Sequence, residues 1–166
     1  TMQGDTIYFA EGMLYYGLDV RSDIDFVALS ETKVRGIKGN VNFRGVQVSI
    51  PEKMSLFVLG NVYGEPGYTN GLKLCGGFSV KGDFYDGSTS YGTMVTMRGD
   101  DALLAVEGNV SNYRTWKVES GQIIFKGSQI TAPGLREIKD ASILIDTAGT
   151  GNITLDTFKL EKRADS

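Results

Sequence analysis

Apolar and polar residues alternate with a period of two along most of the chain, in short runs that glycine, asparagine or proline interrupt. Residues 41–44 (VNFR) and 46–50 (VQVSI) are clean examples, and their apolar positions change parity across Gly45, as a β-bulge would require. Such alternation is typical of half-buried strands, and no run has the 3.6-residue periodicity of a helix. The pattern predicts an all-β protein with roughly twelve to fourteen short strands.

The breaks between the runs predict how these strands pair. Residues 6–10 with 13–20, and 93–97 with 102–106, are expected to form hairpins, and so are the two alternating runs within 140–162. The nearly continuous apolar run 54–62 predicts a central strand buried on both faces. Turn signals at intervals of about 8–12 residues indicate one sandwich or barrel, with no internal repeat and no domain boundary in residues 1–166.

The part of the chain from Asn112 onward resembles the C-terminal half of a carbohydrate-binding-module jelly roll of families four and nine. The resemblance rests on a tryptophan that opens a strand, a second apolar strand and a closing pair of strands, here 116–118, 123–125, 143–145 and 153–161. It implies a jelly-roll-like antiparallel β-sandwich, and we expect one such domain over residues 1–166. Similar modules occur in bacteriophage tail and capsid-surface proteins.

The resemblance also implies a structural calcium near Asp156. A single carboxylate does not supply the six to eight oxygen ligands of a Ca²⁺ site, so an exposed strand residue is the alternative interpretation. No other cofactor is expected.

Composition and charge exclude several classes of function. The net charge of −3 and the isoelectric point near 5.0 argue against nucleic-acid binding, which needs a basic surface. No apolar stretch approaches the ~20 residues of a membrane-spanning helix, so no membrane insertion is expected. The start TMQGD does not resemble a signal peptide, and the single cysteine, Cys75, allows no intrachain disulfide. These features favour folding in a cytoplasm without a cleaved signal.

Catalysis is not expected. The chain has no histidine, which removes Ser-His-Asp and Cys-His sites and ordinary zinc sites. A glycosidase needs only a pair of carboxylates, and there are 20 acidic residues. None of them lies in a motif that differs from a solvated strand edge, so a glycosidase is the least favoured alternative.

Aromatic residues in or beside polar loops are the candidate ligand-binding residues, because exposed flat rings can stack on a sugar or a protein partner. Rings that close the ends of a sandwich are the alternative interpretation. The candidates are Tyr63, Tyr68, Tyr85, Tyr91, Tyr113 and Trp116.

Together these observations predict a non-catalytic structural or adhesion subunit of a virion, of the capsid-decoration or tail type. It would be assembled in the host cytoplasm as a homo-oligomer and would contact other virion proteins and glycans. A soluble carbohydrate-binding module is the main alternative.

Overall fold

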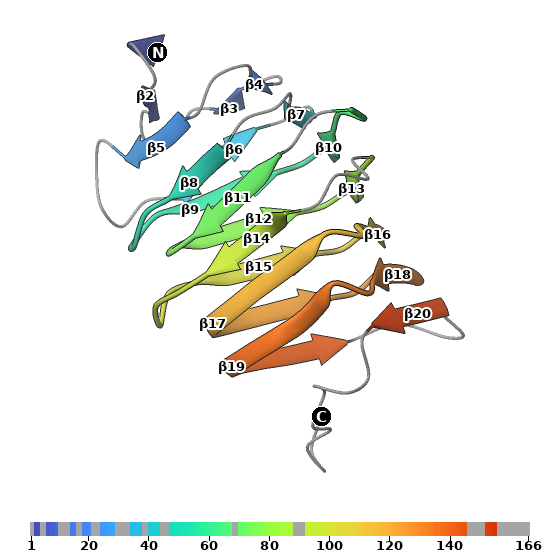
Figure 1. The fold of residues 1–166 in the computed structure, drawn as a ribbon. Helices are drawn as coiled ribbons and strands as arrows, with labels where there is room; N and C mark the ends of the chain where they lie inside the picture. The colour runs from blue at the N-terminus through green and yellow to red at the C-terminus, as the bar shows by residue number, and fades with distance from the viewer. Residues whose placement is uncertain are drawn as a thin grey trace.

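The chain folds as a parallel β-solenoid in the computed structural model, and each turn adds one strand to each of three faces (Figure 1). Side chains are described for residues 40–43, 47–67, 70–87, 92–135 and 138–145. These residues include about four turns of the solenoid. For residues 2–3, 6–9, 14–15, 18–20, 24–28, 34–37, 136–137 and 152–155 only the strands are described.

Strands of one face lie one turn apart in the sequence. The first face is formed by β2 (Thr6–Phe9), β5 (Ile24–Ala28), β8 (Gln47–Ile50), β11 (Gly71–Leu74) and β14 (Thr93–Met97). The second face is formed by β3 (Leu14–Tyr15), β6 (Val34–Ile37), β9 (Ser55–Val58), β12 (Gly77–Val80) and β15 (Leu103–Val106). The third face is formed by β4 (Leu18–Val20), β7 (Val41–Phe43), β10 (Val62–Gly64), β13 (Phe84–Asp86), β16 (Val110–Ser111), β18 (Gln129–Ala132) and β20 (Asn152–Leu155).

Two long strands pass from the first face to the second without interruption. The beginning of β17 (Thr115–Phe125) pairs with β14, and its end pairs with β15. The next long strand, β19 (Leu135–Ile145), pairs with β17 along both parts. All these pairings are parallel; β1 (Met2–Gln3) is antiparallel to β2.

The predicted antiparallel jelly-roll sandwich is therefore wrong, although the all-β class is confirmed. Parallel strands need a long crossover connection, and here the other two strands of each turn provide it. Short strands separated by glycine and asparagine occur in both architectures, because a solenoid corner and a hairpin turn need the same residue types. The local pattern thus gave the strands but not their partners.

The predicted hairpins are wrong for the same reason. Strand β14 pairs with β11 and β17, whereas β15 pairs with β12 and β17, so 93–97 and 102–106 lie on different faces. Strands β19 and β20 pair with β17 and β18 rather than with each other, and β2 pairs with β5 rather than β3.

The apolar run 54–62 is two strands instead of one central strand. Strand β9 ends at Val58 and β10 begins at Val62, and the chain turns between them from the second face to the third. Leu56 and Val58 are buried, but Phe57 is 40% exposed and Leu59 is 44% exposed. The run is therefore buried on one side only.

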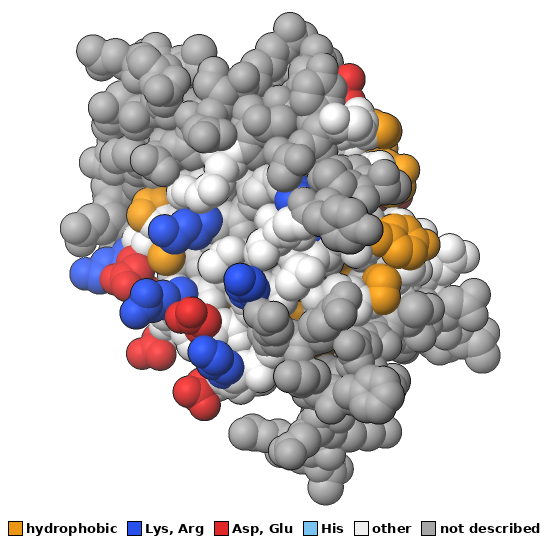
Figure 2. All heavy atoms as spheres, in the orientation of Figure 1, with side chains coloured by type: hydrophobic (Ala, Val, Ile, Leu, Met, Phe, Trp, Pro, Cys, Tyr) orange, Lys and Arg blue, Asp and Glu red, His pale blue; other side chains and the backbone are white. Residues whose placement is uncertain are grey.

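The outward positions give each face a different character. On the first face Ser49, Lys73, Thr96 and Lys117 lie in register, so the described side chains of this row are polar and include two lysines. Figure 2 shows charged side chains gathered at one corner of the molecule, and hydrophobic ones along the opposite edge, where β10 and β13 lie.

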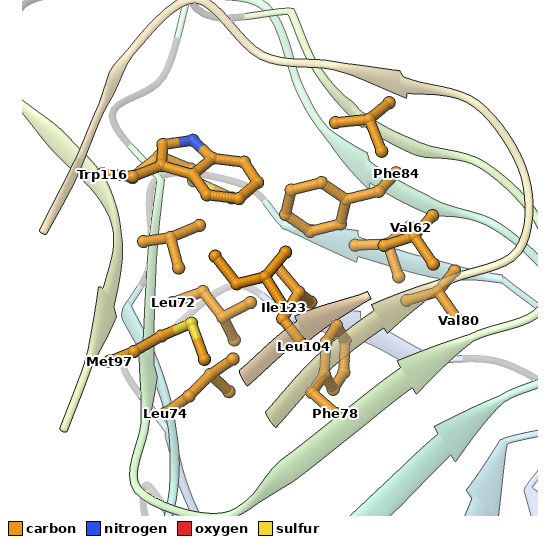
Figure 3. Packing of buried hydrophobic residues seen from close by; sticks show 14 of the residues in the cluster. Val62, Leu72, Leu74, Phe78, Val80, Phe84, Met97, Leu104, Trp116 and Ile123 are labelled. Atoms are coloured by element: carbon orange, nitrogen blue, oxygen red, sulfur yellow. The ribbon is translucent and has the colours of Figure 1, made fainter. Parts of the chain in front are cut away.

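The inward positions stack into apolar columns that fill the solenoid. On the first face Val48, Leu72, Val95 and Trp116 are in register and fully buried. Side chains from the three faces meet at the centre, as Figure 3 shows for Trp116, Phe84 and Ile123 among others. Each large buried side chain contributes about 1.5–3 kcal/mol, so stability increases with each added turn.

Stacked Asn and Asp side chains close the corner between the second and third faces. The Oδ1 atoms of Asn40, Asn61, Asp83 and Asn109 accept the backbone N–H of Asn61, Asp83, Asn109 and Gln129, at 2.8, 2.7, 2.8 and 3.1 Å. Each side chain thus satisfies a corner amide of the following turn. The residues recur 20–26 positions apart, so the expectation of no internal repeat is wrong.

A glycine precedes most of these corner residues because the turns approach too closely for a Cβ. The N–H of Gly82 donates to the carbonyl of Gly60 at 3.0 Å, and that of Gly108 donates to Gly82 at 3.0 Å. A Cβ on Gly127 would overlap the carbonyl oxygen of Gly108.

Replacing Gly127 by alanine should destabilise the protein by about 1–3 kcal/mol, the usual cost of forcing extra atoms into a packed site. Gly71→Ala is the matched control, because its Cβ would be 3.6 Å from the nearest atom, an ordinary contact. Urea unfolding followed by circular dichroism measures both. Equal stability of the two variants would contradict the close stacking of the corner glycines.

Candidate functional site

Two exposed tyrosines lie side by side on the third face. Tyr63 in β10 and Tyr85 in β13 are register partners, and both point outward because Val62, Gly64, Phe84 and Asp86 take the inward positions. Their ring centroids are 6.4 Å apart with an interplanar angle of 69°, an edge-to-face arrangement. Tyr63 is 36% exposed and Tyr85 is 41% exposed, so both rings present apolar area to solvent.

A surface hollow of about 390 Å³ lies beside this pair. Its walls combine the two rings with the side chains of Asn42, Glu65 and Pro66. Asn42 lies opposite Tyr63 on the preceding turn, and the N–H of Glu65 donates to the carbonyl of Phe43 at 2.9 Å. We call Asn42, Tyr63, Glu65, Pro66 and Tyr85 the tyrosine site. It offers flat rings, an amide and a carboxylate, the groups that hold a polyhydroxylated ring.

The absence of a side chain at Gly64 allows the floor of the tyrosine site to form. A Cβ there would overlap Oδ1 of Asp86 and lie 2.8 Å from Nδ2 of Asn70. The neighbouring Gly87 leaves room for the ring of Pro66, whose Cγ would be 2.7 Å from a Cβ at that position. Two glycines thus set how closely the loop carrying Glu65 and Pro66 packs on the next turn.

Beneath the site lies a buried polar cluster, formed by Asn70, Asp86, Asn112 and Arg114, inside an otherwise apolar core. The Nη1 atom of Arg114 is 3.5 Å from Oδ2 of Asp86, and both side chains are almost inaccessible to solvent. Nδ2 of Asn70 donates to Oδ1 of Asp86 at 3.1 Å. The carboxylate is therefore held by an amide from the same corner one turn before it and by a guanidinium from the same corner one turn after it.

Arg114 also ties these corners together through backbone carbonyls. Its guanidinium donates through Nη1 to the carbonyl of Asn70 and through Nη2 to that of Thr93, the second at 3.0 Å. Its own N–H donates to Oδ1 of Asn112 at 3.0 Å. The cluster fixes the connections that lead from the third face back to the first, and with them the loop beside the tyrosine site.

The predicted ligand-binding residues separate into four groups. Tyr63 and Tyr85 lie together in the tyrosine site, and Tyr113 is 63% exposed outside it. Trp116 is fully buried, with Phe84 and Phe125 edge-to-face at 6.0 Å each, so its ring belongs to the core and is not available to a ligand. Tyr68 and Tyr91 lie outside the described residues.

Asp156, the candidate calcium ligand, also lies outside the described residues. Within the part of the chain whose side chains are described, no three His, Cys, Asp or Glu residues are grouped to hold a metal ion. The same part of the chain contains no helix long and apolar enough to span a membrane.

The sequence reasoning missed Asn42, Glu65 and Pro66. Aligning the turns of the chain with one another on their corner residues identifies Asn42 as the counterpart of the two tyrosines. The equivalent triplets are Asn40-Val41-Asn42, Asn61-Val62-Tyr63 and Asp83-Phe84-Tyr85. The third member of each triplet points outward on the third face.

Comparisons of the chain with protein-family models, with curated proteins and with solved structures gave no match. The sugar-binding role implied by the resemblance to carbohydrate-binding modules therefore stays a prediction, while the jelly-roll fold it implied is wrong.

Removing the charge of Arg114 should be costly. Arg114→Met leaves the buried carboxylate of Asp86 without its cation, and breaking a buried pair in this way costs about 3–5 kcal/mol. Arg98→Met is the control, because the Arg98–Glu119 pair is exposed and at 3.5 Å contributes less than about 1 kcal/mol. Chemical denaturation gives both values.

A double variant, Asp86→Leu with Arg114→Met, separates the charge effect from lost packing. Removing both charges should recover part of the stability that Arg114→Met loses. A double variant less stable than Arg114→Met would show that the ion pair is not the main contribution of Arg114.

Proposed function

We propose that this protein is a non-catalytic structural or adhesion protein that attaches to glycans through the tyrosine site. The observation on which this rests is the exposed Tyr63–Tyr85 pair beside a hollow with an amide and a carboxylate. Sugar rings have an apolar face, formed by their C–H groups, and hydroxyls at the edge. Aromatic rings bind the face, and Asn42 and Glu65 can bind the hydroxyls.

The solenoid supports an adhesive role because its outward positions repeat with the spacing of neighbouring strands, about 4.7–4.9 Å. Tyr63 and Tyr85 sit on successive turns of a wall whose inner side is fully packed, so their backbone positions are fixed before a ligand binds. Preorganisation of this kind lowers the entropic cost of binding.

A glycosidase is less well supported by the geometry of the tyrosine site. Among the residues whose side chains are described, its hollow is lined by one carboxylate, Glu65, whereas the common glycosidase mechanisms use two. The nearest acidic side chain beneath the floor, Asp86, is fully buried and paired with Arg114, which suits it to structure rather than to proton transfer.

The two tyrosines should account for most of the glycan affinity. Loss of two ring contacts worth about 0.5–1.5 kcal/mol each predicts that Tyr63→Ala/Tyr85→Ala binds roughly tenfold or more weakly than the wild type. A glycan array identifies a ligand, and affinity electrophoresis or calorimetry with that ligand measures the loss.

Tyr113→Ala is the matched control, because Tyr113 is an exposed tyrosine that does not line the hollow. Tyr63→Phe/Tyr85→Phe retains the rings and should keep most of the affinity. Wild-type protein that binds no glycan on the array, or a double alanine variant that binds unchanged, would refute the proposal.

The virion location is a separate proposal that comes from the sequence. Its support is the sequence resemblance to modules of phage tail and capsid-surface proteins, and the solenoid fold removes the part of that support that came from a shared jelly roll. Co-sedimentation of the purified protein with phage particles tests it, and a protein that joins no particle would argue against it.

A further inference from the structure

The second face carries the large exposed apolar side chains other than tyrosine in the described part of the chain. Six large hydrophobic side chains are exposed among the described residues, and three of them are the tyrosines of the third face and its end. The other three, Phe57, Leu59 and Leu144, are 40%, 44% and 41% exposed and all lie on the second face. Exposed apolar area concentrated in this way marks an interaction surface.

An apolar column runs along the middle of this face. Phe57, Ser79, Ala105, Ile124 and Leu144 follow one another in register on successive turns. The small side chains of Ser79 and Ala105 leave a hollow of about 390 Å³ between the larger ones on either side. This column is the apolar stripe of the second face.

A charged row borders the apolar stripe. Leu59, Lys81, Glu107 and Lys126 occupy equivalent positions, since the N–H groups of Lys81, Glu107 and Lys126 donate to the carbonyls of Val58, Val80 and Val106 at 2.8, 2.9 and 3.0 Å. The row therefore alternates in sign along the axis: Lys81 positive, Glu107 negative, Lys126 positive. All three side chains contribute to the same hollow.

We propose that the second face binds a second copy of this chain, in a two-fold symmetric dimer whose solenoids run antiparallel. With the two-fold axis along the strands, between the turns of Ser79 and Ala105, Lys81 of each copy meets Glu107 of the other. The two ion pairs are related by symmetry, as an isologous interface requires. The charges exclude an axis on the turn of Ser79 or of Ala105, which would place like charges opposite each other. An axis between the turns of Ala105 and Ile124 would pair Glu107 with Lys126, but it would leave Phe57 opposite no described residue of the apolar stripe.

The same axis matches the apolar positions. Phe57 of one copy meets Ile124 of the other, and Ser79 meets Ala105, so the large side chains flank a centre of small ones. Leu59 meets the aliphatic stem of Lys126, whose ammonium group can reach solvent. An anionic membrane or an acidic partner would be matched by a uniformly basic row, and Glu107 in the middle of the row disfavours both.

The test is a charge exchange across the interface. We expect the wild type to associate from 18.0 kDa monomers into dimers between roughly micromolar and hundred-micromolar concentration, as measured by sedimentation equilibrium. K81E and E107K should each raise the dissociation constant roughly tenfold or more, because symmetry makes each change act twice. The double variant K81E/E107K restores opposite charges and should dimerise like the wild type.

Two further variants control the experiment. K73E makes the same charge change on the first face and should leave the dimer unaffected, whereas I124E places a charge in the apolar stripe and should abolish it. All these side chains point outward, and thermal unfolding confirms that each variant is folded. A wild type that stays monomeric, a dimer unaffected by I124E, or a double variant as weak as the single ones would overturn the proposal.

The dimer and the tyrosine site are tested independently. Tyr63→Ala/Tyr85→Ala should dimerise normally, because Tyr63 and Tyr85 lie on the third face. In the wild type, glycan binding without dimerisation would overturn the dimer alone, and dimerisation without glycan binding would overturn the glycan-binding role of the tyrosine site alone.

Discussion

Parallel pairing between equivalent positions of successive turns is the constraint on which the rest of this structure depends. It places each residue directly over its counterpart one turn away, as with Leu72 between Val48 and Val95. A parallel register therefore converts the alternation of apolar and polar residues into continuous columns, apolar inside and variable outside. The stacked oxygens of Asn61, Asp83 and Asn109 satisfy the corner amides that the strands leave unpaired.

Among the residues whose side chains are described, the buried polar cluster is where the inward columns are not apolar. On the third face Phe43 is followed in its column by Gly64, Asp86 and Asn112, and then by Ala132. Because Gly64 has no side chain, the carboxylate of Asp86 on the next turn fits beside it. The guanidinium of Arg114, at the corner, neutralises this carboxylate. Burying these two charges costs desolvation free energy. The buried Arg114 also binds the carbonyls of two corner connections and so fixes the loop beside the tyrosine site.

The strands and the exposed tyrosines could be predicted from the sequence, but the topology could not, for a physical reason. Alternation reports which residues share a side of a strand, and it is identical in a hairpin and in a solenoid turn. Strand pairing depends on contacts 19–26 residues apart, and unequal corner lengths obscure that period. The recurring Gly60-Asn61-Val62, Gly82-Asp83-Phe84 and Gly108-Asn109-Val110 triplets were the signal that remained. For Trp116 the sequence misled the prediction of the site instead of the fold. A tryptophan beside a polar loop can equally be the largest side chain of the core, and Trp116 is buried there.

Three differently composed walls allow one short chain to make several contacts at once. The apolar stripe occupies the second face and the tyrosine site the third, so association through one wall leaves the other open. In the antiparallel dimer, two tyrosine sites would be presented by one rigid body. A glycan surface would then be bound at two points, and the second contact benefits from the effective concentration set by the first. Two linked sites would strengthen weak stacking at an open site of this kind, so the proposed dimer would support the proposed adhesive role of the tyrosine site.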